Sequence, residues 1–227
     1  MFYGCTSLTT APELPATILA DNCYHRMFYN CSSLTTAPEL PATVLAPYCY
    51  NYMFSRCTSL TTAPELPATE LVDECYFGMF EHCSSLTTAP VVLPATTLAP
   101  SCYGSMFYGC TSLTTAPELP ATVLAPSCYR SMFYRCTSLV TSPELPATEL
   151  AVGCYFNMFT NCSSLNSITC LAIDMPYDLT GGWGWPTTAW TYGASSTGTF
   201  YKHPNASWPA GVDGIPYEWE VVNVEAS

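Results

Sequence analysis

MFYGCTSLTTAPELPATVLAPSCYRS, residues 106–131, is the stretch that decides the fold, because its pattern recurs along most of the chain. The motif Met-Phe-x-x-Cys-[Thr/Ser]-Ser-Leu begins seven times, with a spacing of 26 residues that lengthens once to 27. It starts at Met1, Met27, Met53, Met79, Met106, Met132 and Met158. A fixed period of this size is typical of stacked repeats, in which each unit buries its apolar face against its neighbours. The sequence therefore predicts an elongated protein that presents a surface rather than enclosing a catalytic pocket.

Each unit divides into two parts with different periodicities. The run Leu-Thr-Thr-Ala-Pro-Glu-Leu-Pro is too short and too rich in proline for a helix, so it predicts a short extended segment. Stacking would pair these segments as a narrow parallel sheet. In the second part, Leu124, Cys128, Met132 and Cys136 recur at every fourth position, which predicts a short amphipathic helix. The predicted fold class is an α/β repeat with parallel strands on one face and short helices on the other.

Two regions of different composition follow one another along the chain. Residues 1–168 hold about seven 26-residue units and begin in mid-repeat, so we expect either missing upstream sequence or an uncapped first edge. Residues 169–227 contain all five tryptophans and no Met-Phe unit. Since an open end of a solenoid exposes apolar core and strand edges, the second region is interpreted as a small β-rich C-terminal cap. It is expected to be built from β-hairpins, with strands at 198–202 and 214–222.

A competing interpretation of the C-terminal region is a carbohydrate-binding module. The run Gly-Gly-Trp-Gly-Trp places Trp183 and Trp185 close together, and exposed tryptophan rings can stack on sugars. These two residues are therefore candidate binding residues for a glycan.

The run Phe-x-x-Cys-[Thr/Ser]-Ser-Leu resembles the bacterial BspA-like leucine-rich repeat. The chain differs from that pattern in its longer unit and in the methionine that stands where the family has alanine before phenylalanine. The resemblance implies a leucine-rich-repeat solenoid. It also implies a cell-surface or secreted protein of host-associated bacteria that works in adhesion and protein binding, with no shared catalytic residues.

Charge excludes several classes of partner. Five basic residues stand against 17 acidic ones, and the net charge is -12. Nucleic acids and anionic lipids are recognised by lysine and arginine, so neither is an expected partner. No apolar run is long enough to span a membrane, and no signal peptide is visible.

The 14 cysteines form two ladders, with Cys170 alone outside them. Their spacing does not match the pairs that bind zinc, and stacked side chains would have to pair unevenly to form disulfides. We expect buried free thiols, no metal site and no cofactor. His82 lies beside Cys83, but adjacent residues of a helix do not face one another. No catalytic residues are predicted, and the chain is not expected to be an enzyme.

One position of the extended segment carries glutamate in five of the units. Stacking would align these residues into an acidic stripe beside the strands, which either docks a basic partner or calcium or simply keeps the sheet soluble. The residues are Glu13, Glu39, Glu65, Glu118 and Glu144. A protein ligand is expected to be basic and to touch Glu39, Glu65 and Glu118.

The leading functional hypothesis is a non-enzymatic surface repeat protein that binds a protein or a glycan. One alternative is a structural spacer or a component of a phage virion fibre. The other is carbohydrate binding through the tryptophan-rich segment. The positions that vary most between units are the two after each Cys-Tyr pair and the two before the next cysteine, and that variation either encodes recognition or is surface drift.

Overall fold

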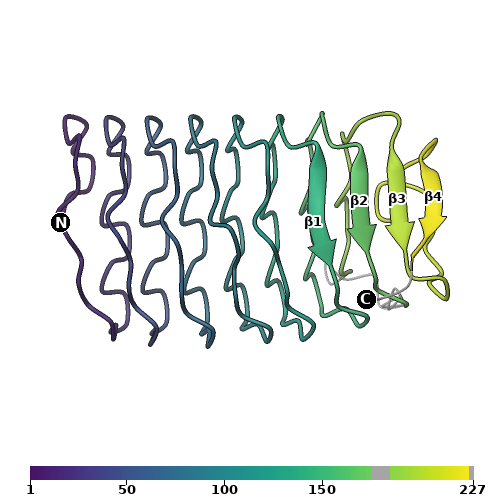
Figure 1. Cartoon of the computed structure of the whole chain (residues 1–227), viewed down its shortest axis with the longest axis horizontal. Helices are drawn as coiled ribbons and strands as arrows, with labels where there is room; N and C mark the ends of the chain where they lie inside the picture. Colours follow the sequence, from purple (N-terminus) through teal and green to yellow (C-terminus); the bar gives the residue numbers. More distant parts are fainter. Residues whose placement is uncertain (175–184, 225–227) are drawn as a thin grey trace.

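The computed structural model describes residues 1–174 and 185–224, which wind into a stack of similar turns (Figure 1). We call each turn of this stack a coil. One coil corresponds to one sequence repeat, and successive coils follow one another along the longest dimension of the molecule. The described residues contain four β-strands and no helix. The repeat solenoid predicted from the sequence is present, but its predicted helical layer is not.

One side of each coil is an extended segment, and most of these segments pair in parallel with the same segment of a neighbouring coil. Four of these segments are strands: β1 (Thr141–Leu145), β2 (Ser167–Cys170), β3 (Thr199–Lys202) and β4 (Glu220–Asn223). They form one sheet in the order β1-β2-β3-β4, and each neighbouring pair is parallel. In earlier coils the ladder is reduced to single bridges such as Thr62↔Thr88, since the prolines that follow cannot donate to it. This face, the strand side, confirms the predicted narrow parallel sheet.

The other side of each coil, the turn side, is a succession of tight turns. Asn22, Arg26 and Asn30 have positive φ angles of 57°, 53° and 59°. The same spacing of four recurs in the following coils, for example at Tyr48, Tyr52 and Arg56 and at Ser127, Ser131 and Arg135. A left-handed residue at every fourth position cannot belong to a right-handed α-helix. The predicted helix between the two cysteines of each unit was therefore wrong.

Backbone hydrogen bonds explain why turns replace the helix. The amides of Tyr24 and Phe28 donate across to the carbonyls of Cys49 and Met53 in the next coil, both at 2.9 Å. Amides between them close turns within the coil, as when Met27 donates to Tyr24 at 3.1 Å. An α-helix would satisfy its donors within one segment. Here alternate donors join neighbouring coils, so the stack is hydrogen-bonded on the turn side as well as on the strand side.

Columns of identical side chains fill the interior. Neighbouring phenylalanine rings are stacked with centroids 5.4 to 5.7 Å apart. This column contains Phe2, Phe28, Phe54, Phe80, Phe107, Phe133 and Phe159. A tyrosine column has centroids 5.5 to 6.0 Å apart. Stacked pairs of this kind contribute about 0.5–1.5 kcal/mol each beyond the area they bury. The core therefore favours the alignment in which each ring lies on the equivalent ring of the next coil.

The cysteines are part of this core. The Cys57 thiol donates to the carbonyl of Phe28 in the preceding coil, with an Sγ to oxygen distance of 3.1 Å, and later coils repeat this bond. Burial raises the pKa of Cys57 and Cys162 to about 12. The predicted columns of buried thiols are confirmed except at Cys5 and Cys23, which are exposed in the first coil.

The tryptophan-rich segment continues the stack instead of forming hairpins. Tyr155 and Phe159 donate their amides to the carbonyls of Pro186 and Trp190, as they would to a further repeat. Strands β3 and β4 extend the parallel sheet, so the hairpin arrangement expected for this segment was wrong. Trp190 is fully buried and contacts the last ring of both aromatic columns. That the segment acts as a stabilising cap stays a prediction.

Candidate binding surfaces

The five glutamates of the predicted stripe all lie on the strand side and are exposed. Consecutive members of the stripe line shared hollows between coils, in the pairs Glu13 and Glu39, Glu39 and Glu65, and Glu118 and Glu144. The structure therefore brings these predicted residues together, two at a time, along one face.

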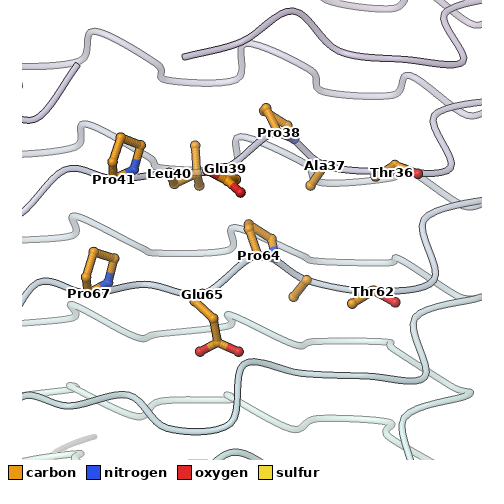
Figure 2. A pocket seen from close by; sticks show the side chains of 11 residues that line it. Thr36, Ala37, Pro38, Glu39, Leu40, Pro41, Thr62, Pro64, Glu65 and Pro67 are labelled. Carbon is orange, nitrogen blue, oxygen red and sulfur yellow. The ribbon is translucent and has the colours of Figure 1, made fainter. Parts of the chain in front are cut away.

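Two rows of proline border the glutamates. Figure 2 shows Pro38 beside Pro64 at one side of the hollow, and Pro41 beside Pro67 at the other. The hollow between Glu39 and Glu65 has a volume of about 450 Å³, and alanine, leucine and threonine complete its lining. Since proline side chains are rigid and their amides carry no hydrogen, these rows form apolar walls around carboxylates. A cationic side chain with an apolar stem fits such a surface.

The acidic stripe is interrupted in the fourth unit. Val91 occupies the outward position there and is 71 % exposed. Its amide donates to the Glu65 carboxylate at 3.3 Å, and its carbonyl accepts from the Glu118 amide at 3.0 Å. The interruption divides the stripe into a group of three glutamates and a group of two.

The tryptophans are mainly structural. Trp190, Trp208 and Trp219 each donate the indole N–H to a backbone carbonyl, at 2.8 to 2.9 Å. Trp185 is half-buried, and its carbonyl accepts from the hydroxyl of Thr188. Trp183 lies outside the described residues, so the pair proposed for sugar binding stays a prediction.

The turn side carries contacts that the repeat pattern did not indicate. Arginine side chains lie over aromatic rings, with Arg26 5.2 Å from the centroid of Tyr52 and Arg130 5.0 Å from that of Phe156. Glycine makes room for some of these rings, because a Cβ at Gly78 would lie 2.5 Å from the Tyr52 ring. The variable positions of each repeat therefore form a surface of interlocking rings, recesses and guanidinium groups.

Neither surface has the elements of a catalytic site. His82 faces Glu81 at 4.0 Å, and the neighbouring Cys83 thiol is buried, with its pKa raised well above 9.0 by that burial. Within residues 1–174 and 185–224, no three His, Cys, Asp or Glu side chains are grouped as metal ligands. The described residues also include no helix that is long and apolar enough to cross a membrane.

The stacked coils, their parallel strand ladder and the outward-facing stripe define a solenoid repeat protein. The chain belongs to the BspA type leucine rich repeat family, whose model matches in six copies over residues 1–114 and 79–173. This confirms the resemblance predicted from the repeated motif. A leucine-rich repeat protein from Bacteroides ovatus of known crystal structure is similar at 18 % identity, with a TM-score of 0.40 over 94 % of this chain. The chain covers 56 % of that protein, and the comparison with curated proteins found no match.

Proposed function

We propose that this chain is a non-enzymatic binding protein, on a cell surface or secreted, whose strand side receives a basic segment of another protein. The observation that supports this most directly is the repeated hollow with one glutamate from each of two neighbouring coils. Membership of a repeat family agrees with a binding role.

Electrostatics favours a basic partner. All four arginines lie on the turn side. The remaining basic residue, Lys202 at the C-terminal end of β3, donates hydrogen bonds from its ammonium group to the carbonyls of His203 and Ala206. The glutamates of the stripe therefore have no cation beside them on their own face. Rows of like charge raise the local negative potential, which speeds the encounter with a cationic ligand and makes binding sensitive to salt.

Three other roles are less well supported. Calcium would need oxygen ligands that converge on one point, and Glu65 instead accepts a hydrogen bond from the Val91 backbone. Sugar binding through the tryptophans is less well supported, because the indoles of Trp190, Trp208 and Trp219 donate to backbone carbonyls. A pure spacer would leave the hollows of the strand side without a ligand, so that role does not account for them.

The test replaces Glu39, Glu65 and Glu118 together by glutamine, which keeps side-chain size and removes charge. Lysine-rich peptides selected from a random library should associate several-fold more slowly with this variant than with the original protein at low salt. A matched control converts Asp21, Asp73 and Glu149, which lie outside the hollows, to their amides. Equal rates for the triple variant and the original protein, with both folded, would reject the proposal.

A further inference from the structure

The arginines are segregated on the turn side and have no acidic partners. The chain has 17 acidic residues, yet the ion pair found in its described part is that between His82 and Glu81. Arg26, Arg56, Arg130 and Arg135 are all exposed and make no side-chain hydrogen bond within that part. Their guanidinium donors are therefore free to meet another molecule.

Three of these arginines lie over aromatic rings: Arg26, described above, and the neighbouring pair Arg130 and Arg135. Arg130 lies over Phe156 with its Cζ 5.0 Å from the ring centroid, and Arg135 lies over Tyr134 at 5.6 Å. A guanidinium group over a ring is stabilised by the cation–π interaction, while its N–H groups remain directed around the rim of its plane. Such an arginine loses less conformational entropy when it binds a carboxylate than a freely moving one.

The turn segments that hold and flank this pair contain no acidic residue of their own. The turn segments 101–110, 127–136 and 153–162 include no aspartate or glutamate. Among the earlier turn segments, 21–31 contains Asp21 and 73–83 contains Asp73, Glu74 and Glu81, whereas 47–57 contains no acidic residue. Glu81 marks the border, because it is close enough to contribute to the raised pKa of Tyr108, behind the larger effect of burial. A positive, ring-lined patch thus lies within a chain of net charge -12.

The ring geometry indicates which kind of anion fits. Tyr134 stacks on Tyr108 with centroids 4.6 Å apart and an interplanar angle of 2°, and Arg135 lies over the Tyr134 ring. Arg130 lies over Phe156 in the same way. A sugar needs an open ring face for stacking, whereas these rings are already stacked or covered. Arginine and tyrosine are the residues enriched at the centres of protein–protein interfaces, and arginine binds carboxylates in a bidentate fork.

From these contacts we infer that Arg130, Tyr134, Arg135 and Phe156 form a second docking surface, the turn patch, for an acidic segment of a protein partner. The turn patch is independent of the glutamate stripe, which lies on the strand side. At about 0.15 M salt the screening length is about 8 Å. Repulsion from the distant glutamates is then weak, while direct contacts between arginine and carboxylate persist.

The experiment is a selection of random 12-residue displayed peptides on the intact protein at 0.15 M salt, followed by titration of the selected peptides. We expect a pool enriched in aspartate and glutamate. Its members should bind the Arg130→Gln/Arg135→Gln variant at least tenfold more weakly. The matched control, Arg26→Gln/Arg56→Gln, alters two arginines in the half of the turn side that also carries acidic residues, and it should change affinity less than twofold. Thermal melting of both variants checks that they fold.

Three results would overturn the inference: no acidic enrichment, acidic peptides that bind the Arg130/Arg135 variant equally well, or an equal loss in the control variant. The glutamate triple variant separates this inference from the proposed function. It should lose the lysine-rich pool and keep the acidic one. If the triple variant still binds the lysine-rich pool normally, the strand-side proposal is rejected. The turn-patch inference then still stands, because it depends on the acidic pool.

Discussion

The strand side and the turn side of this molecule obey different sequence rules. On the strand side both outward and inward positions repeat, so that proline and glutamate recur beside buried leucine. On the turn side only the inward cysteine, tyrosine, methionine and phenylalanine recur, and the outward residues change from coil to coil. Both sides are joined to the next coil by backbone hydrogen bonds.

This difference shows what the stack itself requires. Backbone bonds and the core columns fix the inward positions, whereas outward positions of the turn side are constrained where the backbone has a positive φ, as at Arg26 and Gly78. The repetition of glutamate on the strand side has no such backbone cause, so it reflects duplication history or binding. The following predictions break or sharpen this comparison, beginning with the core that the two sides share.

Alkaline pH should destabilise both sides together. Burial raises the pKa of Cys57, Cys75 and Cys128 from 9.0 to about 12, so the folded state keeps these protons after the unfolded chain has lost them. Their stabilising contribution is complete below pH 9 and is lost as the pH rises from 9 towards 12. In that range each buried thiol lowers the free energy of unfolding by about 1.4 kcal/mol per pH unit. Urea unfolding should therefore show a loss of several kcal/mol between pH 9 and 10.5.

The control for this experiment replaces the exposed Cys5 and Cys23 by serine, which should leave the pH dependence unchanged. Stability that stays constant up to pH 10.5 would contradict the buried columns of thiols.

A substitution that leaves one cavity in the core should lower the free energy of unfolding less than alkaline pH does. It should lower it more than substitution of an exposed side chain. Leu60 is fully buried, and Leu60→Ala is expected to reduce the free energy of unfolding by about 2–5 kcal/mol. Met53→Ala, in the same core, should behave alike. The neighbouring exposed residue provides the comparison, because Thr61→Ala should change stability by less than about 0.5 kcal/mol. Equal effects in the two positions would mean that the inward and outward assignments are wrong.

A substitution in a glycine recess on the turn side should cost less stability than a core cavity. Gly78 has a φ of 60°, and its added Cβ would lie 2.5 Å from the Tyr52 ring. Gly78→Ala should cost about 1–2 kcal/mol from its left-handed backbone, with a further cost for displacing the ring. A double-mutant cycle with Tyr52→Ala isolates the ring contribution. Gly4→Ala, at a φ of 68° with no atom within 4 Å of the new Cβ, measures the backbone cost alone.

The sequence predicted the strand side better than the turn side. Leucine, alanine and proline in the Leu-Thr-Thr-Ala-Pro-Glu-Leu run indicated a narrow parallel ladder, which the bridges and β1 confirm. On the turn side, the spacing of Cys128, Met132 and Cys136 fits a helix and a run of four-residue turns equally well. Glycine and asparagine at every fourth position, as in Gly153, Asn157 and Asn161, were the available signal for turns.

Other features depend on contacts between coils and could not be read from one repeat. Arg135 adopts a positive φ of 60° although its side chain does not favour it, because its amide bonds to Thr160 in the next coil at 2.8 Å. Residues 186–193 continue the turn side without a Met-Phe motif, since the connecting bonds use only the backbone. The glutamate positions followed from the repeat, whereas the proline-walled hollows required knowing how neighbouring coils lie.

The most direct test of the account is a hydrogen-exchange footprint of the protein with a bound lysine-rich 12-residue peptide. The strand side is predicted to bind, so protection should increase at residues 36–41, 62–67 and 116–120, where the hollows lie. Exchange on the turn side, including residues 127–136, should not change. Protection confined to the turn side or to residues 185–224 would contradict the assignment of the strand side as the face for basic ligands.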